Sequence, residues 1–290
     1  YGPIPYSQIS GSAFTVAYDS MDKLYEAMFE DLEEAIVAFK TSVLAGEDMS
    51  SLAEYDLVFD GDFNRWVKFA NTLKLRMAMR ISNVAPELAR QKAEEAVTDV
   101  VGVMTTSADA AYSNYNDGMN PYYRVAFSWN EIRVSANITS YLSGCNDPRL
   151  AVYANDAQLT DGGKVGVRNG IYQSDATQAS YANFSRPNIG MDDKLLIMSA
   201  SEAYFLRAEG ALKGWNMNGS AKELYEQGVQ VAMEERGVSA VGYLERTDTP
   251  ADYVDPTDSG KNRTAVSTIC PKWDDAASAE VNLERILVQK

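Results

Sequence analysis

Residues 61–82, GDFNRWVKFANTLKLRMAMRIS, constrain the fold of this chain more than any other stretch. Their large apolar side chains recur at intervals of three or four residues, namely at Trp66, Phe69, Leu73, Met77 and Ile81. This spacing places them on one side of a helix. Asp62 can cap the start of the helix, and Pro86 prevents its continuation. A helix with one apolar side needs a partner surface, so the sequence predicts helices packed on helices.

The same helix is basic, whereas the chain as a whole is acidic. Its basic side chains are Arg65, Lys68, Lys74, Arg76 and Arg80. The chain contains 26 Lys and Arg against 41 Asp and Glu, and its formal net charge is −15. We therefore expect the basic side chains to form ion pairs with neighbouring acidic helices. The overall charge also argues against a nucleic-acid partner, because phosphates would be repelled.

Further helical segments flank this one. Helical spacing or capping signals predict helices near residues 20–45, 86–101, 135–143, 195–215, 220–238 and 277–290. Asp19 or Ser20 can cap the first of these, and Gly46 closes it. The two segments around residues 195–238 are separated by a short polar turn and resemble a tetratricopeptide unit. The fold class predicted is all-α, with tetratricopeptide-like helical pairs.

The composition removes several kinds of chemistry. The chain has no histidine, which excludes Ser-His-Asp and Cys-His catalysis and histidine-ligated zinc. Its two cysteines, Cys145 and Cys270, lack metal-binding spacing, and whether they pair stays open. No stretch of about 18 apolar residues predicts a membrane span. We expect no cofactor and no bound metal.

Residues 102–193 lose helical spacing and become rich in Tyr, Asn, Gly and Asp. Long irregular segments of this kind often carry function. The candidate ligand-binding residues are Tyr112, Tyr115, Asn116, Asp117, Tyr122, Tyr123 and Trp129, with Phe127, Asn114, Asn120 and Asn130 beside them. Aromatic faces stack on sugar rings, and amides and carboxylates bond to hydroxyls, so this mixture suits a glycan. The alternative is that these rings pack the irregular segment onto the helices.

Two other patterns leave alternatives open. A second candidate group contains Tyr172, Tyr181 and Phe184 with Asn183 and Arg186. Oxygen-bearing side chains in residues 114–121 would also suit calcium, although they fail the EF-hand template. Two acids, Asp274 and Asp275, follow Trp273, and this pair would suit a carboxylate-based glycoside hydrolase.

Five segments in order along the chain resemble the SusD/RagB family of outer-membrane nutrient-binding lipoproteins of Bacteroidetes. They are IPYSQ at residues 4–8, the helix at 61–82, DPRL at 147–150, MSASEAYFLRAEGALKGW at 198–215, and NLERILVQK at 282–290. The resemblance implies one SusD-like domain over residues 1–290, with helical parts at 19–101 and 194–290. The loop-rich insertion at 102–193 would then bear the binding surface.

The resemblance also implies a function. Such proteins are not enzymes; they bind an oligosaccharide, or in some cases a peptide, and act with a SusC-like TonB-dependent transporter. They lie on the extracellular face of the outer membrane, held by an N-terminal lipid anchor. No cysteine that could carry the lipid precedes Cys145, and family members are usually longer, so we expect further segments beyond both ends. The alternatives are a glycoside hydrolase and a helical-repeat interaction scaffold.

Overall fold

A computed structural model of the chain describes residues 1–290 except 1, 10, 12–13, 115–117, 159–162 and 171–180. Its α-helices are α1 Met21–Ala45, α2 Phe63–Ile81, α3 Pro86–Thr98, α4 Pro121–Tyr123, α5 Ala136–Gly144, α6 Arg149–Tyr153, α8 Ala200–Leu212, α9 Ala221–Glu234 and α10 Ala279–Gln289. Short 3-10 helices span Ser50–Leu52, Ser107–Asp109 and Ser259–Lys261, and a π-helical turn spans Arg124–Ser128. The strands β1 Ala111–Ser113 and β2 Leu195–Met198 form an antiparallel pair.

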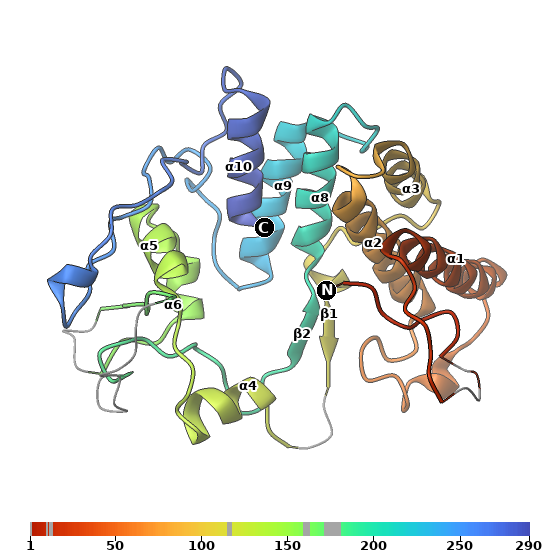
Figure 1. Cartoon of the computed structure of the whole chain (residues 1–290), viewed down its shortest axis with the longest axis horizontal. Coiled ribbons are helices and arrows are strands. Elements are labelled where there is room, and N and C mark those ends of the chain that lie inside the picture. Colours follow the sequence, from red (N-terminus) through yellow and green to blue (C-terminus); the bar gives the residue numbers. More distant parts are fainter. Residues whose placement is uncertain (1, 10, 12–13, 115–117, 159–162, 171–180) are drawn as a thin grey trace.

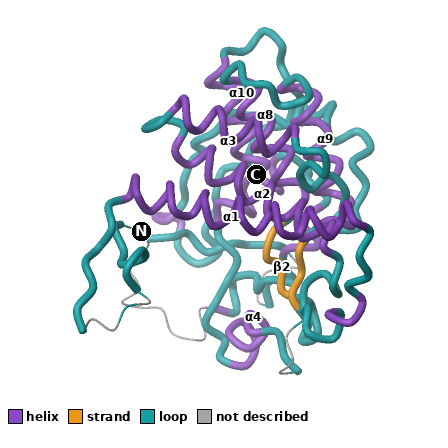
Figure 2. Tube along the Cα trace, turned by 90° about the vertical axis from the view of Figure 1, so that its right-hand side faces the viewer, coloured by secondary structure: helices purple, strands orange, loops and turns teal. Residues whose placement is uncertain are grey.

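The longer helices pack against one another on one side of the molecule (Figures 1 and 2). Figure 1 shows α8, α9 and α10 side by side, with α1, α2 and α3 next to them. Figure 2 shows β2 next to this helical layer and α4 farther away from it. The core of the layer consists of fully buried side chains from several helices, including Leu75, Phe205, Leu206, Leu224 and Tyr225. The predicted all-α class of helical pairs is confirmed.

Helix α2 has the start that its sequence predicts and some of the ion pairs expected for it. The Asp62 carboxylate accepts a hydrogen bond from the Arg65 amide at 3.1 Å. Lys74 Nζ lies 2.7 Å from Glu33 of α1 and 2.8 Å from Glu95 of α3, so it joins three helices. The remaining pairs of α2 join Lys68 to Asp109 at 2.8 Å and Arg76 to Glu202 at 2.6 Å. Three of the five basic residues therefore pair with acidic neighbours. Among the described residues, Arg65 and Arg80 form no ion pair, and Arg65 instead donates to the Ala110 carbonyl at 3.2 Å and lies over the Phe59 ring.

One predicted helix begins later than its sequence suggested. We expected helical structure to resume at Leu195, and this is wrong, because residues Leu195–Met198 form β2. They pair with β1, where Tyr112 lies opposite Leu196. The apolar run at 195–198 suits either a strand or a helix, and pairing with β1 decides between them. Helix α8 then starts after Ser199, an extended residue.

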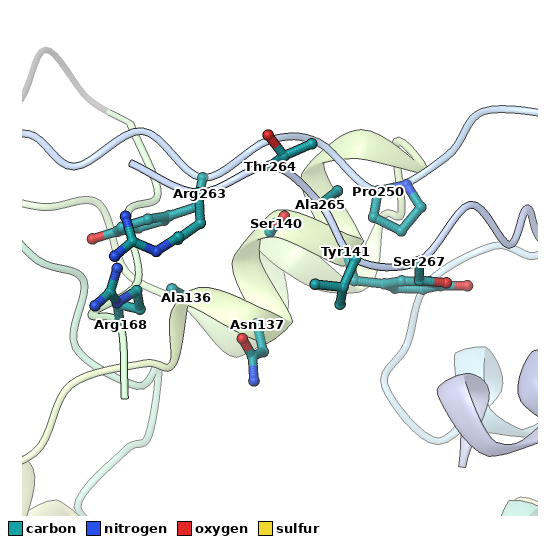
Figure 3. A pocket seen from close by; sticks show the side chains of 12 residues that line it. Ala136, Asn137, Ser140, Tyr141, Arg168, Pro250, Arg263, Thr264, Ala265 and Ser267 are labelled. Atoms are coloured by element: carbon teal, nitrogen blue, oxygen red, sulfur yellow. The ribbon is translucent and has the colours of Figure 1, made fainter. Parts of the chain in front are cut away.

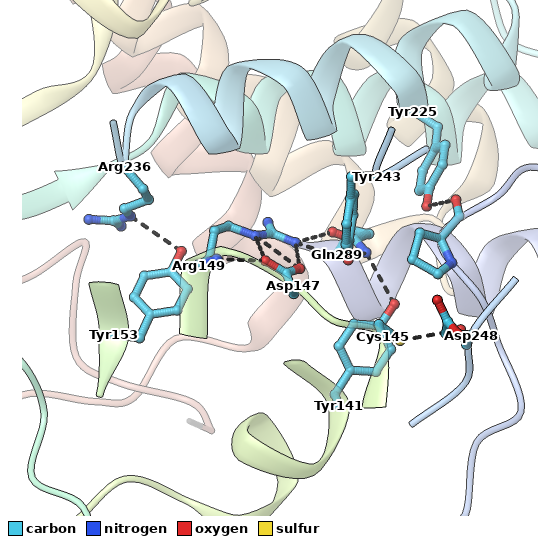
Figure 4. A network of polar contacts seen from close by, with 11 residues as sticks. Tyr141, Cys145, Asp147, Arg149, Tyr153, Tyr225, Arg236, Tyr243, Asp248 and Gln289 are labelled. Carbon is cyan, nitrogen blue, oxygen red and sulfur yellow. Dashed lines mark hydrogen bonds and ion pairs between the residues drawn. The ribbon is translucent and has the colours of Figure 1, made fainter. Parts of the chain in front are cut away.

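A buried polar network fastens the loop-rich part of the chain to the last helix (Figure 4). Asp147 and Arg149, from the DPRL motif, are both 4% exposed and form an ion pair at 2.6 Å. Arg149 Nη2 also donates to Gln289 Oε1 of α10 at 2.6 Å. The Gln289 amide donates in turn to the hydroxyls of Tyr141 at 3.1 Å and Tyr243 at 2.9 Å. Two of the segments that carry the family resemblance thus contact each other directly.

Candidate functional site

The aromatic segment, defined here as Tyr122, Tyr123, Phe127 and Trp129, extends through α4 and the π-helical turn. Its start is fixed by Asn120, which is 3% exposed. The Asn120 Oδ1 accepts from the amides of Tyr122 at 2.8 Å and Tyr123 at 3.2 Å. Its Nδ2 donates to the carbonyl of Asp193 at 2.8 Å, just before β2. One buried side chain therefore caps this short helix and ties it to the strand pair.

The rings of the segment divide into an exposed pair and a stacked pair. Tyr122 and Trp129 are each 55% exposed. Tyr123 and Phe127 stack with centroids 4.7 Å apart and an interplanar angle of 20°. The π-helical turn ends where the Trp129 amide donates to the Arg124 carbonyl at 2.9 Å. Insertions of this kind re-aim side chains and are frequent at functional sites.

Two arginines converge beside the segment. The guanidinium groups of Arg133 and Arg186 both donate to Asn130 Oδ1, each at 2.7 Å. Arg186 lies over the Phe127 ring at 5.3 Å, and Arg133 over the Tyr181 ring at 5.1 Å. Burial, together with the neighbouring charge of Arg186, lowers the pKa of Arg133. Asn130 adopts φ 60°, a left-handed conformation that asparagine tolerates.

Next to these arginines lies a cavity of about 130 Å³, which we call the rim cavity. It is lined by Phe127, Arg133, Asn155, Asp156, Gln158, Tyr181, Ala182, Phe184 and Arg186. Phe127 comes from the first candidate group in the sequence, and Tyr181, Phe184 and Arg186 come from the second. The structure therefore brings parts of the two candidate groups into one site.

The other candidate residues are distributed differently. Tyr112 lies in β1, half-buried, and burial raises the pKa of its hydroxyl, with Arg236 and Glu235 as charged neighbours. Its surroundings are thus the end of α9 rather than the arginines of the rim cavity. Four candidates lie outside the described residues, namely Tyr115, Asn116, Asp117 and Tyr172.

Several lining residues were not predicted. Arg133 belongs to one segment and Asn155, Asp156 and Gln158 to another, and no spacing in the sequence links the two segments. The only available signal was the position of Arg133 next to the aromatic run, four residues after Trp129. The backbone brings the segments together through pairing between residues 155 and 186 and between 158 and 182.

The chemistry of the site suits binding. It combines exposed rings for stacking, amides for hydroxyls and guanidinium groups for acceptor oxygens. In the part of the chain that the structure describes, no three His, Cys, Asp or Glu side chains are grouped to hold a metal ion. The acids after Trp273 make ordinary surface contacts, since Asp275 pairs with Lys222 at 2.9 Å and Asp274 accepts from the Ala276 amide. Cys145 and Cys270 are free thiols.

Among the described residues, no helix has the length and apolar character needed to cross a membrane. The fold is that of an all-α protein of helical pairs, and its loop-rich part carries an aromatic and amide-rich surface. The family model of SusD-like proteins, described as Susd and RagB outer membrane lipoprotein, matches residues 1–290. The chain belongs to this family, whose members are binding proteins. No curated protein matches the chain.

Solved structures agree with this assignment. A chitin-binding SusD homologue from Flavobacterium johnsoniae is 40% identical, with a TM-score of 0.95 over 100% of this chain and 60% of that one. A SusD-like protein from Bacteroides thetaiotaomicron is 44% identical, with a TM-score of 0.92 over 99% of this chain and 60% of that one. A SusD homologue from Bacteroides vulgatus is 35% identical, with a TM-score of 0.91 over 100% and 59%. The chain thus spans about 60% of the length of these proteins.

Proposed function

We propose that this chain is the scaffold and part of the binding surface of a non-enzymatic, lipid-anchored glycan-binding protein on the outer face of the outer membrane. It captures an oligosaccharide and delivers it to a SusC-like TonB-dependent transporter. The observation that carries the proposal is the aromatic segment, where two rings are 55% exposed beside a cavity lined by amide and guanidinium groups. The buried Asn120 side chain, which caps the start of the segment and ties it to the residue before β2, supports this role, because a pre-ordered surface loses little entropy on binding.

A chitooligosaccharide is the first ligand to test, because one similar protein is a chitin-binding homologue. Its neutral N-acetylated rings would stack on Tyr122 and Trp129 and offer acetamide and hydroxyl groups to the side chains of the rim cavity. The full-length protein that contains this chain is the sample to use. Isothermal titration against a panel of oligosaccharides that includes chitooligosaccharides measures the affinity.

We expect Trp129→Ala and Tyr122→Ala each to weaken the binding of the best glycan by about tenfold or more, as truncation of a central aromatic contact commonly does. Tyr55→Ala is the matched control, because Tyr55 is 75% exposed and lies outside the aromatic segment. A reducing-sugar assay on the same samples should detect no product. Failure of the protein to bind any glycan in the panel, or unchanged affinity in both variants, would refute this role.

The transporter partnership is tested separately. A tag on the full-length protein should recover a TonB-dependent transporter from outer membranes solubilised in mild detergent. Recovery should persist in Trp129→Ala, since that change removes a ligand contact rather than the scaffold. Recovery of no transporter at all would contradict the delivery step while leaving glycan capture to be judged by titration.

A further inference from the structure

A second cavity, which we call the α5 cavity, lies between helix α5 and the segment 250–267 (Figure 3). Its volume is about 290 Å³, at the small end of the range for small-molecule sites. It is lined by Ala136, Asn137, Ser140, Tyr141, Arg168, Pro250, Tyr253, Arg263, Thr264, Ala265, Val266 and Ser267. It shares no lining residue with the aromatic segment or the rim cavity.

Two arginines stand together at one end of this cavity, as Figure 3 shows. The Arg168 guanidinium donates to the Lys261 carbonyl at 3.2 Å. That of Arg263 donates to the carbonyls of Asn262 at 2.6 Å and Gly260 at 3.3 Å. Within the described residues, neither arginine forms an ion pair with a carboxylate. In a chain of net charge −15, two neighbouring cations whose partners among the described residues are neutral carbonyls leave donors for an anion from outside.

The backbone holds both arginines in place. Tyr253 and Arg263 exchange amide-to-carbonyl hydrogen bonds of 2.8 and 3.0 Å across an antiparallel bridge. On the other side, Val167 bonds to both Val134 and Ala136 at the start of α5, which positions Arg168. Such pre-ordering reduces the cost of binding.

The nearby Asp255 carboxylate accepts hydrogen bonds from groups other than the two arginines. Asp255 is 6% exposed and accepts from the Tyr253 hydroxyl at 2.9 Å and the Thr257 hydroxyl at 2.8 Å. It also accepts from the backbone amides of Thr257 and Asp258. Backbone and hydroxyl donors thus occupy this carboxylate, and it does not neutralise the two arginines.

The rest of the cavity suits a sugar ring. Figure 3 shows Tyr141 at the end opposite the arginines, with Asn137 between them. The Tyr141 hydroxyl accepts from Gln289 in the buried network at 3.1 Å, which fixes the ring. The Asn137 side chain is exposed and offers both a donor and an acceptor.

We infer that the α5 cavity is a second, independent subsite that binds an acidic sugar. Its oxyanion, a carboxylate or a sulfate ester, bonds to Arg168 and Arg263, while the sugar ring lies against Tyr141 and its hydroxyls meet Asn137. A planar carboxylate matches the paired donors of a guanidinium group, so a uronic acid is the first candidate.

The test is isothermal titration of the full-length protein with an oligogalacturonate and with its neutral methyl ester, which have the same shape but differ in charge. We expect wild type to bind the acid at least tenfold more tightly than the ester. Arg168→Gln with Arg263→Gln should remove this preference and flatten the salt dependence. Arg90→Gln is the control for loss of a positive charge elsewhere, since it removes one such charge from the exposed face of α3 and matches the single variant Arg263→Gln.

A sulfated oligosaccharide and inorganic sulfate form the remaining arms. Preference for the sulfated sugar, lost in the double variant, supports the inference with sulfate as the oxyanion. Equal affinity for inorganic sulfate and for the sugars overturns it, as does equal binding of acid and ester by wild type. If the double variant misfolds, Arg263→Gln alone serves as the test variant, because Arg263 is exposed and its hydrogen-bond partners among the described residues are backbone carbonyls.

These outcomes are separable from the proposed neutral-glycan function. Trp129→Ala should not change the preference for the acid over the ester, because Trp129 does not line the α5 cavity. Binding of neutral glycans without any acid preference would therefore remove the second subsite and leave the first intact.

Discussion

Arg149 and Arg186 both belong to the loop-rich insertion, yet their surroundings are opposite. Arg149 is 4% exposed, forms an ion pair with Asp147 at 2.6 Å and donates to Gln289. Arg186 is half-buried and shares a single amide oxygen, Asn130 Oδ1, with another arginine. Both guanidinium groups lie near an aromatic ring, but only the first has a carboxylate partner among the described residues.

The difference separates charge used for structure from charge available to a ligand. Burial lowers the pKa of Arg149, but the hydrogen bond and charge of Asp147, together with Tyr243 and Tyr153, raise it overall, so the pair holds its charge inside the protein. Arg186 lines the rim cavity and shares the neutral Asn130 with Arg133, while the acid of the same cavity, Asp156, is paired with Lys164 at 2.6 Å. We therefore expect removal of Arg149 to affect stability and removal of Arg186 to affect affinity.

The largest expected effect is that of Arg149→Ala. Removing one partner leaves the buried Asp147 carboxylate without its counter-ion and breaks the bond to α10. Such losses cost about 3–5 kcal/mol. Urea unfolding followed by circular dichroism should show a lower free energy of unfolding. Arg90→Ala, which breaks an exposed pair with Glu94, should cost at most about 1 kcal/mol. Equal costs for the two variants would show that burial of the network does not matter.

Gly144→Ala should have the next largest effect. A Cβ at this position, at the end of α5, would lie 2.1 Å from the Ala251 nitrogen and 2.4 Å from the Thr249 oxygen. Backbone must move to relieve these overlaps, at a cost of about 1–3 kcal/mol. Gly163→Ala is the control, since among the described residues the nearest atom to its new Cβ would be Val165 Cγ2 at 3.9 Å. Thermal melting compares the two, and a cost near zero for Gly144→Ala would mean that the 249–251 segment is not held against α5.

The contribution of Asp109 to the stability of the helical layer should depend on pH. Burial raises the pKa of this carboxyl, but Lys68 and the amides of Thr105 and Thr106 outweigh burial and lower it overall. Its contribution to stability is thus present above the unfolded pKa of about 3.9 and is lost as the pH falls through the lower folded value.

Asp109→Asn should cost about 1.5–3 kcal/mol at pH 7, the range for hydrogen bonds to a charged group. The difference from wild type should shrink as the pH falls below about 4. Urea unfolding across the pH range measures it, with Asp192→Asn at an exposed position as control. A difference that stays constant down to the lowest pH would show that the charge of Asp109 contributes nothing.

The helical layer was predictable because its signals are local. The apolar spacing and Asp62 cap of α2, the closing Gly46 of α1 and the basic character of α2 each depend on neighbours along the chain. Leu195 was assigned wrongly because a four-residue apolar strand depends on β1, more than 80 residues away. Pairing at that separation leaves no periodicity in the sequence.

The candidate site was predictable in part. Composition alone identified the aromatic segment, because the density of rings and amides is itself the signal. The meeting of Phe127 with Arg186, and of Arg168 with Arg263, depends on backbone pairing between distant loops, which composition does not encode. The stacked pair also shows the limit of composition, since the Tyr123 and Phe127 rings contact each other, and part of their area is used for packing.

The smallest effect expected on stability is that of Arg186→Gln. This variant tests whether Arg186, unlike Arg149, serves binding rather than stability. Glutamine keeps a donor for Asn130 but removes the charge from the rim cavity, so the free energy of unfolding should change by less than about 1 kcal/mol. Affinity for the best glycan should fall about three- to tenfold, because a charge-assisted hydrogen bond becomes a neutral one. Titration and urea unfolding on the same samples measure both quantities, with Arg90→Gln as control.

If stability falls as far as in Arg149→Ala while affinity does not change, Arg186 is a structural residue, and the absence of a carboxylate partner does not mark a binding arginine in this fold.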